Sequence, residues 1–86
     1  MRVTVISPEA AVFDGEADAV VAPAFDGELG ILANHAPLMT VLGTGVLRVT
    51  TGGTTRRFRV QGGFLQVVKN SVRILAERVQ GESDVA

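Results

Sequence analysis

Residues 62–76 read Gly-Gly-Phe-Leu-Gln-Val-Val-Lys-Asn-Ser-Val-Arg-Ile-Leu-Ala, and this stretch decides the fold class. Apolar and polar side chains alternate in residues 65–67, and the same period of two returns in residues 72–76. A period of two places one set of side chains on an apolar face of a strand and the other set near water. Lys69-Asn70 separates the two runs, and asparagine tolerates the left-handed backbone that tight turns need. The stretch therefore predicts a β-hairpin.

The rest of the chain repeats this pattern on both sides of the hairpin. Similar alternation occurs in residues 2–6, 47–50 and 57–60. Gly52-Gly53 and Asp14-Gly15 are typical of two further tight turns, whereas Gly43-Thr44-Gly45 and Gly62-Gly63 indicate bends or bulges. Short strands at this spacing, without a long helical pattern, predict an all-β sandwich or barrel.

Helix is expected at one place only, and the last residues are expected to lie outside the domain. Residues 34–38, Asn-His-Ala-Pro-Leu, could form at most a single helical turn, because Pro37 limits its length. Residues 80–86 are polar and lack periodicity, so we expect a flexible tail there. The predicted organisation is one domain over residues 1–79 followed by this tail.

Composition excludes several functional classes. The chain has 86 residues, enough for one domain, with 47% hydrophobic and 20% charged residues. It contains no cysteine, which excludes disulfides, thiol nucleophiles and zinc–thiolate sites. Its longest nearly apolar run, residues 19–25, is shorter than the roughly 20 residues that a bilayer requires. We expect no signal peptide, no membrane insertion and a cytoplasmic protein.

Charge is unevenly distributed along the chain. The formal net charge is −1, which gives no general attraction to nucleic acid. Residues 1–45 hold one base against six acids, whereas residues 46–86 hold seven bases against three acids. Two interpretations remain: solvated sheet faces, or a polarised surface that orients docking to charged partners.

The candidate catalytic and metal-binding residues lack the neighbouring residues that such sites require. His35 is the single histidine, and it lacks partners at metal-binding spacing. Asp26 and Glu28 flank Gly27, an arrangement more typical of a solvated turn or a polar contact than of acid–base catalysis. The sequences Gly27-Glu28-Leu29-Gly30 and Gly62-Gly63 do not match a phosphate-binding loop. We expect no catalytic residue, no metal and no cofactor.

Two basic features allow binding interpretations. Arg56, Arg57 and Arg59 form a short basic stretch without interleaved aromatics, so a solvated strand face is the default and an acidic protein partner is the alternative to it. Lys69 is the single lysine and lies at a predicted hairpin tip. That position is similar to the modified lysine of biotinyl and lipoyl carrier domains, although Val68 and Asn70 are not their characteristic neighbours. A carrier module is the alternative function.

Longer motifs resemble a known family. Val5-Ile6-Ser7-Pro8-Glu9 and Val12-Phe13-Asp14-Gly15-Glu16-Ala17 resemble the opening of the epsilon subunit of F-type ATP synthases. The family's later motifs follow in order, from residue 20 to about residue 77: Val20-Val21-Ala22-Pro23, Gly27-Glu28-Leu29-Gly30-Ile31-Leu32, Asn34-His35-Ala36-Pro37-Leu38, Gly45-Val46-Leu47-Arg48-Val49, Gly62-Gly63-Phe64-Leu65-Gln66-Val67 and Asn70-Ser71-Val72-Arg73-Ile74-Leu75-Ala76. Each motif is weak alone, and their combination is specific.

The resemblance implies a fold, partners and site residues. It implies a flattened β-sandwich of about ten strands. It also implies a non-catalytic rotor subunit of the central stalk, bound to the gamma subunit and the c-ring at the cytoplasmic face of a bacterial membrane. Glu28 and His35 match positions that face the c-ring, whereas Ser7, His35 and Thr40 match positions that face gamma.

The chain departs from the family pattern at two places. Many relatives have Pro-Gly before the loop histidine, where this chain has Ala33-Asn34; because asparagine tolerates a left-handed backbone, the turn should survive. Typical relatives also continue into a two-helix domain that can bind ATP, and this sequence shows no such helical motif. We therefore expect neither nucleotide binding nor helical self-inhibition from these residues.

Overall fold

A computed structural model describes the backbone of residues 1–85 and the side chains of residues 1–81. Strands account for most of the described residues, and no helix occurs among them. The strands are β1 (Arg2–Ile6), β2 (Ala11–Glu16), β3 (Ala19–Ala24), β4 (Gly27–Leu32), β5 (Leu38–Val41), β6 (Thr44–Thr51), β7 (Thr54–Val68) and β8 (Ser71–Val85). Consequently, no helix in this part of the chain is long and apolar enough to cross a bilayer.

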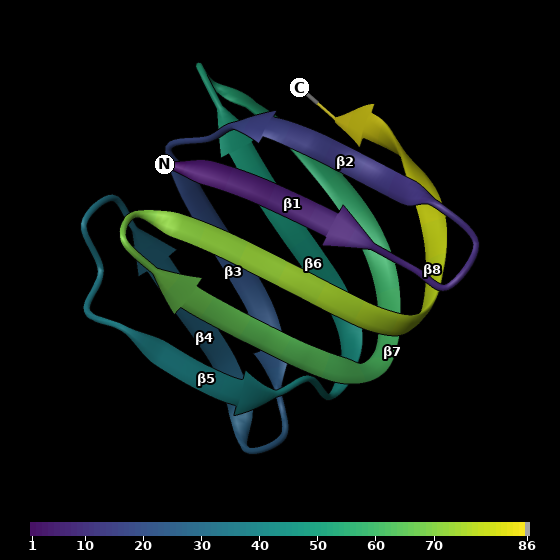
Figure 1. Cartoon of the computed structure of the whole chain (residues 1–86). Helices are drawn as coiled ribbons and strands as arrows, with labels where there is room; N and C mark the ends of the chain where they lie inside the picture. Colours follow the sequence, from purple (N-terminus) through teal and green to yellow (C-terminus); the bar gives the residue numbers. More distant parts are fainter. Residues whose placement is uncertain (86) are drawn as a thin grey trace.

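The strands form one mixed sheet that folds into two layers (Figure 1). Their order is β2-β1-β8-β7-β6-β3-β4, and β5 pairs with β7. The first and last strands, β1 and β8, are parallel, and the other pairs are antiparallel. The all-β sandwich that the sequence predicts is confirmed, with eight strands in the described residues in place of about ten.

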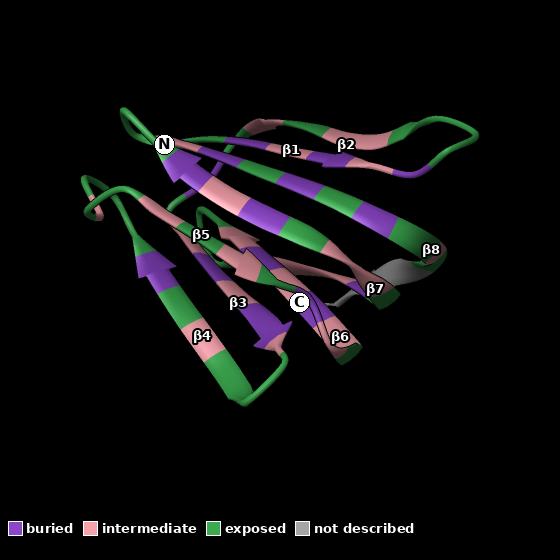
Figure 2. Ribbon diagram, turned by 60° about the horizontal axis from the view of Figure 1, so that its bottom comes forward, coloured by how far each residue is buried: buried purple, intermediate pink, exposed green. Residues whose placement is uncertain are grey.

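Two long strands account for the difference in strand number. Strand β7 pairs with β6 through Gln61 and with β5 from Phe64 onward, so its two halves belong to different layers. Strand β8 follows β7 around the same corner (Figure 2). The near layer contains β2, β1, the first half of β8, the second half of β7, and β5. The far layer contains the remaining halves together with β6, β3 and β4.

The predicted bend at Gly62-Gly63 is this corner. Gly62 has φ 67° and Gly63 has φ 115°, which glycine adopts without strain. A Cβ atom at Gly63 would overlap the backbone oxygen of Leu75. The Gly63 carbonyl accepts a hydrogen bond from the Leu42 amide (2.9 Å), which ties the corner to the link between β5 and β6.

Two predicted turns are confirmed and one is wrong. Gly52-Gly53 joins β6 to β7, and Lys69-Asn70 joins β7 to β8, all four residues having positive φ. Asp14-Gly15 instead lies inside β2, with Gly15 opposite Val3. A glycine is compatible with this extended position because β2 is an edge strand, which pairs with β1 alone.

The segment before β5 is a turn rather than a helix. Ala33 and Asn34 form the turn, and Asn34 has φ 64°, as its residue type allowed. The left-handed Asn34 does not continue into a right-handed helix, and Pro37 favours an extended conformation at Ala36 before it. The chain therefore enters β5 at Leu38 without a helical turn.

The core lies between the layers and consists of the inward side chains of the alternating strands (Figure 2). Val3, Leu65 and Ile74 from the near layer, and Leu47 and Val60 from the far layer, are completely buried. Among the described residues, no buried side-chain nitrogen or oxygen lacks a hydrogen-bond partner. The period of two therefore predicts the core correctly.

The predicted tail begins inside a strand. Gln80 lies opposite Arg59 and Gly81 opposite Phe58, so both continue β8. The side chains of residues 82–85 and the whole of Ala86 lie outside the described residues, and a flexible tail there stays a prediction.

Candidate interaction surfaces

His35 lies in the loop between β4 and β5, in a setting that offers little chemistry. Its side chain is half-buried, and its Nδ1 lies 2.7 Å from the carbonyl oxygen of Ala36. The His35 backbone amide donates to the Leu32 carbonyl (3.2 Å). No group of three His, Asp or Glu side chains in the described residues could hold a metal ion.

The loop that carries His35 is held to the neighbouring hairpin. The Asn34 amide donates a hydrogen bond of 2.7 Å to Oδ1 of Asn70. The Asn70 carbonyl in turn accepts a hydrogen bond from the Arg2 amide (3.1 Å). Lys69 is exposed on this hairpin, next to a residue whose side chain and backbone are both engaged.

Glu28 is exposed but already has a partner. The turn predicted around Gly27 and Glu28 lies earlier in the chain, at Phe25 and Asp26, and Glu28 is instead the second residue of β4. Nη2 of Arg48 lies 3.3 Å from both carboxylate oxygens of Glu28. An exposed pair of this kind stabilises a fold by about 0–1 kcal/mol.

The side chains of Ser7 and Thr40 are less exposed to solvent than those of a typical interface residue. Ser7 is buried, and its hydroxyl is hydrogen-bonded to the backbone of Ala10 within the link between β1 and β2. Thr40 lies directly opposite the buried Leu65, and directly opposed residues of an antiparallel pair share a face. The half-buried Thr40 side chain therefore points toward the core.

The structure does not bring the four predicted interface residues into one site. Glu28 and the His35 loop lie toward opposite ends of β4, and Ser7 lies beyond the far end of β1 (Figure 1). Their proposed contacts with other subunits therefore concern separate parts of the surface.

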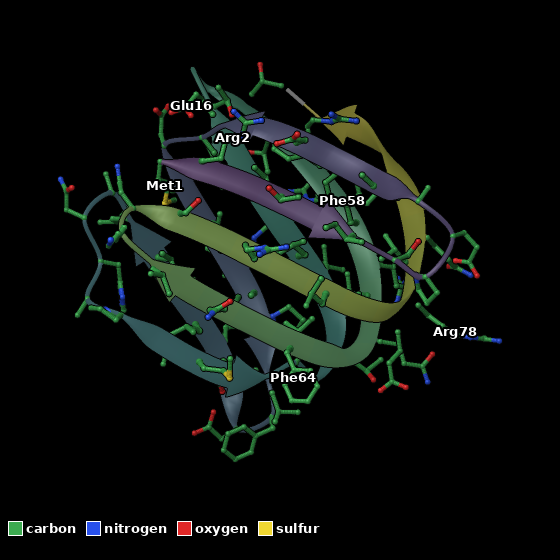
Figure 3. The ribbon with its side chains drawn as sticks, in the orientation of Figure 1. Met1, Arg2, Glu16, Phe58, Phe64 and Arg78 are labelled. Atoms are coloured by element: carbon green, nitrogen blue, oxygen red, sulfur yellow. The ribbon has the colours of Figure 1, made fainter. Side chains whose placement is uncertain are left out.

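A row of exposed apolar side chains crosses the outer face of the near layer. The pairing register places Val41 beside Phe64, Phe64 beside Leu75, and Leu75 beside Ile6. Val41, Phe64 and Leu75 are 47%, 53% and 44% exposed, and Ile6 is half-buried. We call these four residues the apolar row. Figure 3 shows Phe64 at the lower edge of the near layer.

Two shallow grooves follow the apolar row. The larger, of about 380 Å³, lies between Phe64, Leu75 and the Ile6-Ser7-Pro8 segment. The smaller, of about 240 Å³, lies between Phe64, Leu75 and Met39, which is 64% exposed. Their walls are mainly apolar, with Gln66 and Arg73 on one side. Isolated exposed apolar residues are common, whereas a contiguous group of them is typical of an interaction site.

Sequence reasoning missed the apolar row although a signal was present. Residues 64–65 and 74–75 are consecutive apolar pairs, so strands β7 and β8 carry apolar side chains on both faces. A strand buried on both faces gives this pattern, and here none of the described residues forms a layer over the outer face.

The basic stretch is divided between the two sides of β7. Arg56 is half-buried, with its guanidinium carbon 5.3 Å from the ring centre of Phe13 and 5.4 Å from that of Phe58. Arg57 and Arg59 alternate with Arg56 and Phe58 along β7 and therefore point to its other side, where Arg59 is exposed. The three arginines therefore do not form one patch.

Comparisons with known proteins agree on one family. The family model described as "ATP synthase, Delta/Epsilon chain, beta-sandwich domain" matches residues 1–82. Among curated relatives, the ATP synthase epsilon chain of Leptospira borgpetersenii is 42% identical over 99% of this chain and 67% of the relative. That of Desulforamulus reducens is 47% identical over 92% of this chain and 60% of the relative. That of Caulobacter vibrioides is 46% identical over 90% of each chain.

Solved structures show the same fold. A chain from the structure of Euglena gracilis mitochondrial ATP synthase, comprising OSCP, F1 and c-ring, superimposes with a TM-score of 0.86 at 26% identity. The match covers 92% of this chain and 51% of that one. A chain from the central stalk and c-ring of Tetrahymena thermophila mitochondrial ATP synthase gives 0.80 at 20% identity, covering 94% of this chain and 66% of that one. This chain thus spans about half to two thirds of most of these proteins.

Proposed function

Because this chain belongs to the ATP synthase delta/epsilon chain family, we propose that it is a non-catalytic subunit of the central stalk. In this role it binds the gamma subunit and the c-ring, and it couples ion flow and rotation to ATP synthesis on other subunits. It is a peripheral protein at the cytoplasmic face of a bacterial membrane. The names of the relatives and the assemblies that contain its structural neighbours support the proposal.

The observation that carries the proposal is the apolar row. In the proposed complex, the gamma subunit covers this row. Strands β5, β7, β8 and β1 contribute one residue each, so the row lies on a rigid sheet rather than on loops. Removing roughly half of each side chain from water contributes on the order of 1 kcal/mol per residue. An apolar centre with a polar rim is the usual anatomy of a stable protein interface.

The residues proposed for gamma contact fit around this row to different degrees. Ser7 borders the larger groove, next to Ile6. Thr40 points toward the core, so we assign its part of the contact to the exposed neighbours Met39 and Val41. His35 lies just beyond β5 in the sequence and would contact the edge of the partner.

Calorimetric titration with the cognate gamma subunit tests the apolar row. We expect Phe64→Ser and Leu75→Ser each to weaken binding by about tenfold or more, because central apolar contacts dominate interface energy. Leu32→Ser is the matched control, since Leu32 is 67% exposed and lies on β4 in the far layer. Equal binding by all three variants, or no binding of the wild-type chain to a folded gamma subunit, would overturn the assignment.

We place the c-ring contact at Glu28 and the His35 loop. When a basic group of the c-ring approaches Glu28, it either displaces Arg48 from the Glu28 carboxylate or shares that carboxylate with Arg48. Because both groups are partly exposed, the exchange costs little. Glu28→Lys should therefore weaken the association with the c-ring in membranes while leaving the fold unchanged. An unchanged amount of assembled rotor in that variant would remove Glu28 from the interface.

A carrier function for Lys69 remains a separate hypothesis. Lys69 is exposed at the tip of a two-residue turn, as the carrier interpretation requires. However, Val68 and Asn70 flank it, and the Asn70 side chain is bonded to the His35 loop. Intact-mass measurement after co-expression with a biotin or lipoate ligase distinguishes the two functions. We expect the unmodified mass, and a mass increase on Lys69 would favour the carrier.

A further inference from the structure

The outer face of the far layer carries a cluster of arginines, of which the proposed function involves Arg48 alone, through its pair with Glu28. Four arginines lie there on strands β6, β7 and β8, and we call their surface the basic face: Arg48, Arg57, Arg59 and Arg78. Arg48 and Arg57 are directly opposed, and Arg59 follows Arg57 by two positions on the same side of β7. Arg78 joins them from β8, opposite Gln61, and it points outward in Figure 3.

Three of the four arginines of the basic face have no ion-pair partner among the described side chains. Arg48 pairs with Glu28, whereas Arg57, Arg59 and Arg78 form no ion pair or hydrogen bond with any described residue. Like charges directly opposed across two strands destabilise a sheet. Glu28 pairs with Arg48, and among the described side chains Arg57 has no such partner, so a carboxylate from outside would reduce the repulsion between them.

The two most exposed arginines of the basic face line a common hollow. It has a volume of about 100 Å³, suited to one small anionic group. Among the described residues its lining consists of hydrogen-bond donors and Val60, without a carboxylate: Thr44, Arg59, Gln61, Arg78 and Gln80. Glu77 lines the adjoining larger hollow together with Arg78, without forming an ion pair with it.

We propose that the basic face binds an acidic segment of a protein partner, with one carboxylate in the hollow between Arg59 and Arg78 and another at Arg57. A guanidinium presents a planar set of donors that matches a carboxylate. Residues two apart on a strand lie about 7 Å from each other, so an extended segment with acids at alternate positions matches Arg57 and Arg59. The Arg48–Glu28 pair is an example, within this chain, of the arginine–carboxylate contact that we propose with the partner.

Nucleic acid and membrane fit the basic face less well. Single-stranded nucleic acid is held by aromatic side chains on which bases stack, and the hollow is lined by none. Binding to an anionic membrane by a surface element also uses large exposed apolar side chains, whereas the one apolar residue that lines the hollow, Val60, is buried. The inference does not rest on the proposed central-stalk role, since it concerns Arg57, Arg59 and Arg78, which belong neither to the apolar row nor to the Arg48–Glu28 pair.

The probe is a fluorescein-labelled peptide with glutamates at alternate positions. The full chain is titrated into the peptide, and the fluorescence anisotropy of the peptide reports binding. We expect saturable binding at about 20 mM salt that weakens several-fold at about 150 mM, because screening shortens the reach of exposed charges. Arg59→Gln combined with Arg78→Gln should weaken binding by about tenfold or more. Arg73→Gln is the matched control, because Arg73 is an exposed arginine of β8 on the outer face of the near layer.

The same experiment can overturn the inference in three ways. Absence of peptide binding to the folded wild-type chain would leave the basic face as a solvated surface. Equal weakening by Arg73→Gln would show general attraction rather than a site. Tighter binding of inorganic phosphate, a single-stranded oligonucleotide or anionic vesicles than of the peptide would assign the face to another class of partner. Circular dichroism of each variant verifies that it is folded.

Discussion

Phe13 and Phe58 illustrate how single side chains join the two layers. Phe13 lies on β2 and Phe58 on the first half of β7, and their ring centres are 6.2 Å apart at an angle of 64°. This edge-to-face geometry is favourable beyond the burial of the rings, by about 0.5–1.5 kcal/mol. The guanidinium of Arg56 lies over both rings, which further favours the cluster.

We expect the two rings to be energetically coupled. In a double-mutant cycle of Phe13→Leu and Phe58→Leu, the coupling in the free energy of unfolding should be about 0.5–1.5 kcal/mol. Urea denaturation followed by far-UV circular dichroism measures the four proteins. Additive effects, within about 0.3–0.5 kcal/mol, would contradict the contact.

Asn70 has two separable roles at the turn between β7 and β8. Its φ of 61° requires a residue that tolerates the left-handed region, and its side chain accepts the Asn34 amide. Asn70→Gly keeps the first role and loses the second, so amide hydrogen exchange at Asn34 should accelerate with little loss of stability. Asn70→Ala loses both roles and should cost about a further 1 kcal/mol. Equal stability of the two variants would show that backbone conformation at Asn70 is not limiting.

At the scale of elements, the corner of β7 depends on its two glycines, and Gly63 is the more constrained of them. Any side chain at Gly63 would overlap the Leu75 backbone, and its φ of 115° is unfavourable for other residues. We expect Gly63→Ala to lower the free energy of unfolding by about 1–3 kcal/mol or more. Gly30→Ala is the matched control: Gly30 lies inside β4, has no positive φ, and has nothing within 4 Å of an added Cβ.

Thermal and urea unfolding of both glycine variants measure this difference. The control should match or slightly exceed the stability of the wild type, because alanine lowers the entropy of the unfolded chain. A Gly63→Ala protein as stable as Gly30→Ala would mean that the corner adjusts without strain. In that case β7 would bend through a broader region than the two glycines.

The strands and the hairpins were largely predictable, because their determinants are local. Alternation in residues 65–67 and 72–76 predicted the buried side chains, and Lys69-Asn70 predicted the turn between them. The joining of residues 57–60 and 65–67 into one strand was not predictable, because continuity depends on pairing with β8. Asp14-Gly15 was misassigned for a related reason: its extended conformation is set by β1, which is distant in the sequence.

Interaction surfaces were less predictable than the strands. The apolar row and the basic face each combine residues from three or four strands, and only the register brings those residues together. Sequence indicated Arg57 and Arg59 as basic, but it could not join them to Arg78 or separate them from Arg56. The resemblance predicted that Thr40 contacts gamma, but it gave no information about the direction in which the Thr40 side chain points.

For the whole molecule, the parallel pairing of β1 with β8 governs how the fold forms. Strand β8 lies between β1 and β7, so the near layer is complete only after the two ends of the chain have met. Closing a long loop costs entropy before the contact is gained, and β-rich folds with distant pairings fold in about milliseconds to seconds. The β7–β8 hairpin, joined by two residues, can form first.

Folding kinetics should therefore distinguish the hairpin from the β1–β8 pair. We expect Leu65→Ala, in the hairpin, to slow refolding more than Val3→Ala, which should mainly accelerate unfolding. Both side chains are fully buried, so both variants lose enough stability for the ratio to be measured. Because the chain lacks Trp and Tyr, stopped-flow circular dichroism is the suitable probe. Stronger slowing by Val3→Ala would indicate that the ends of the chain meet early and that the hairpin forms on that template.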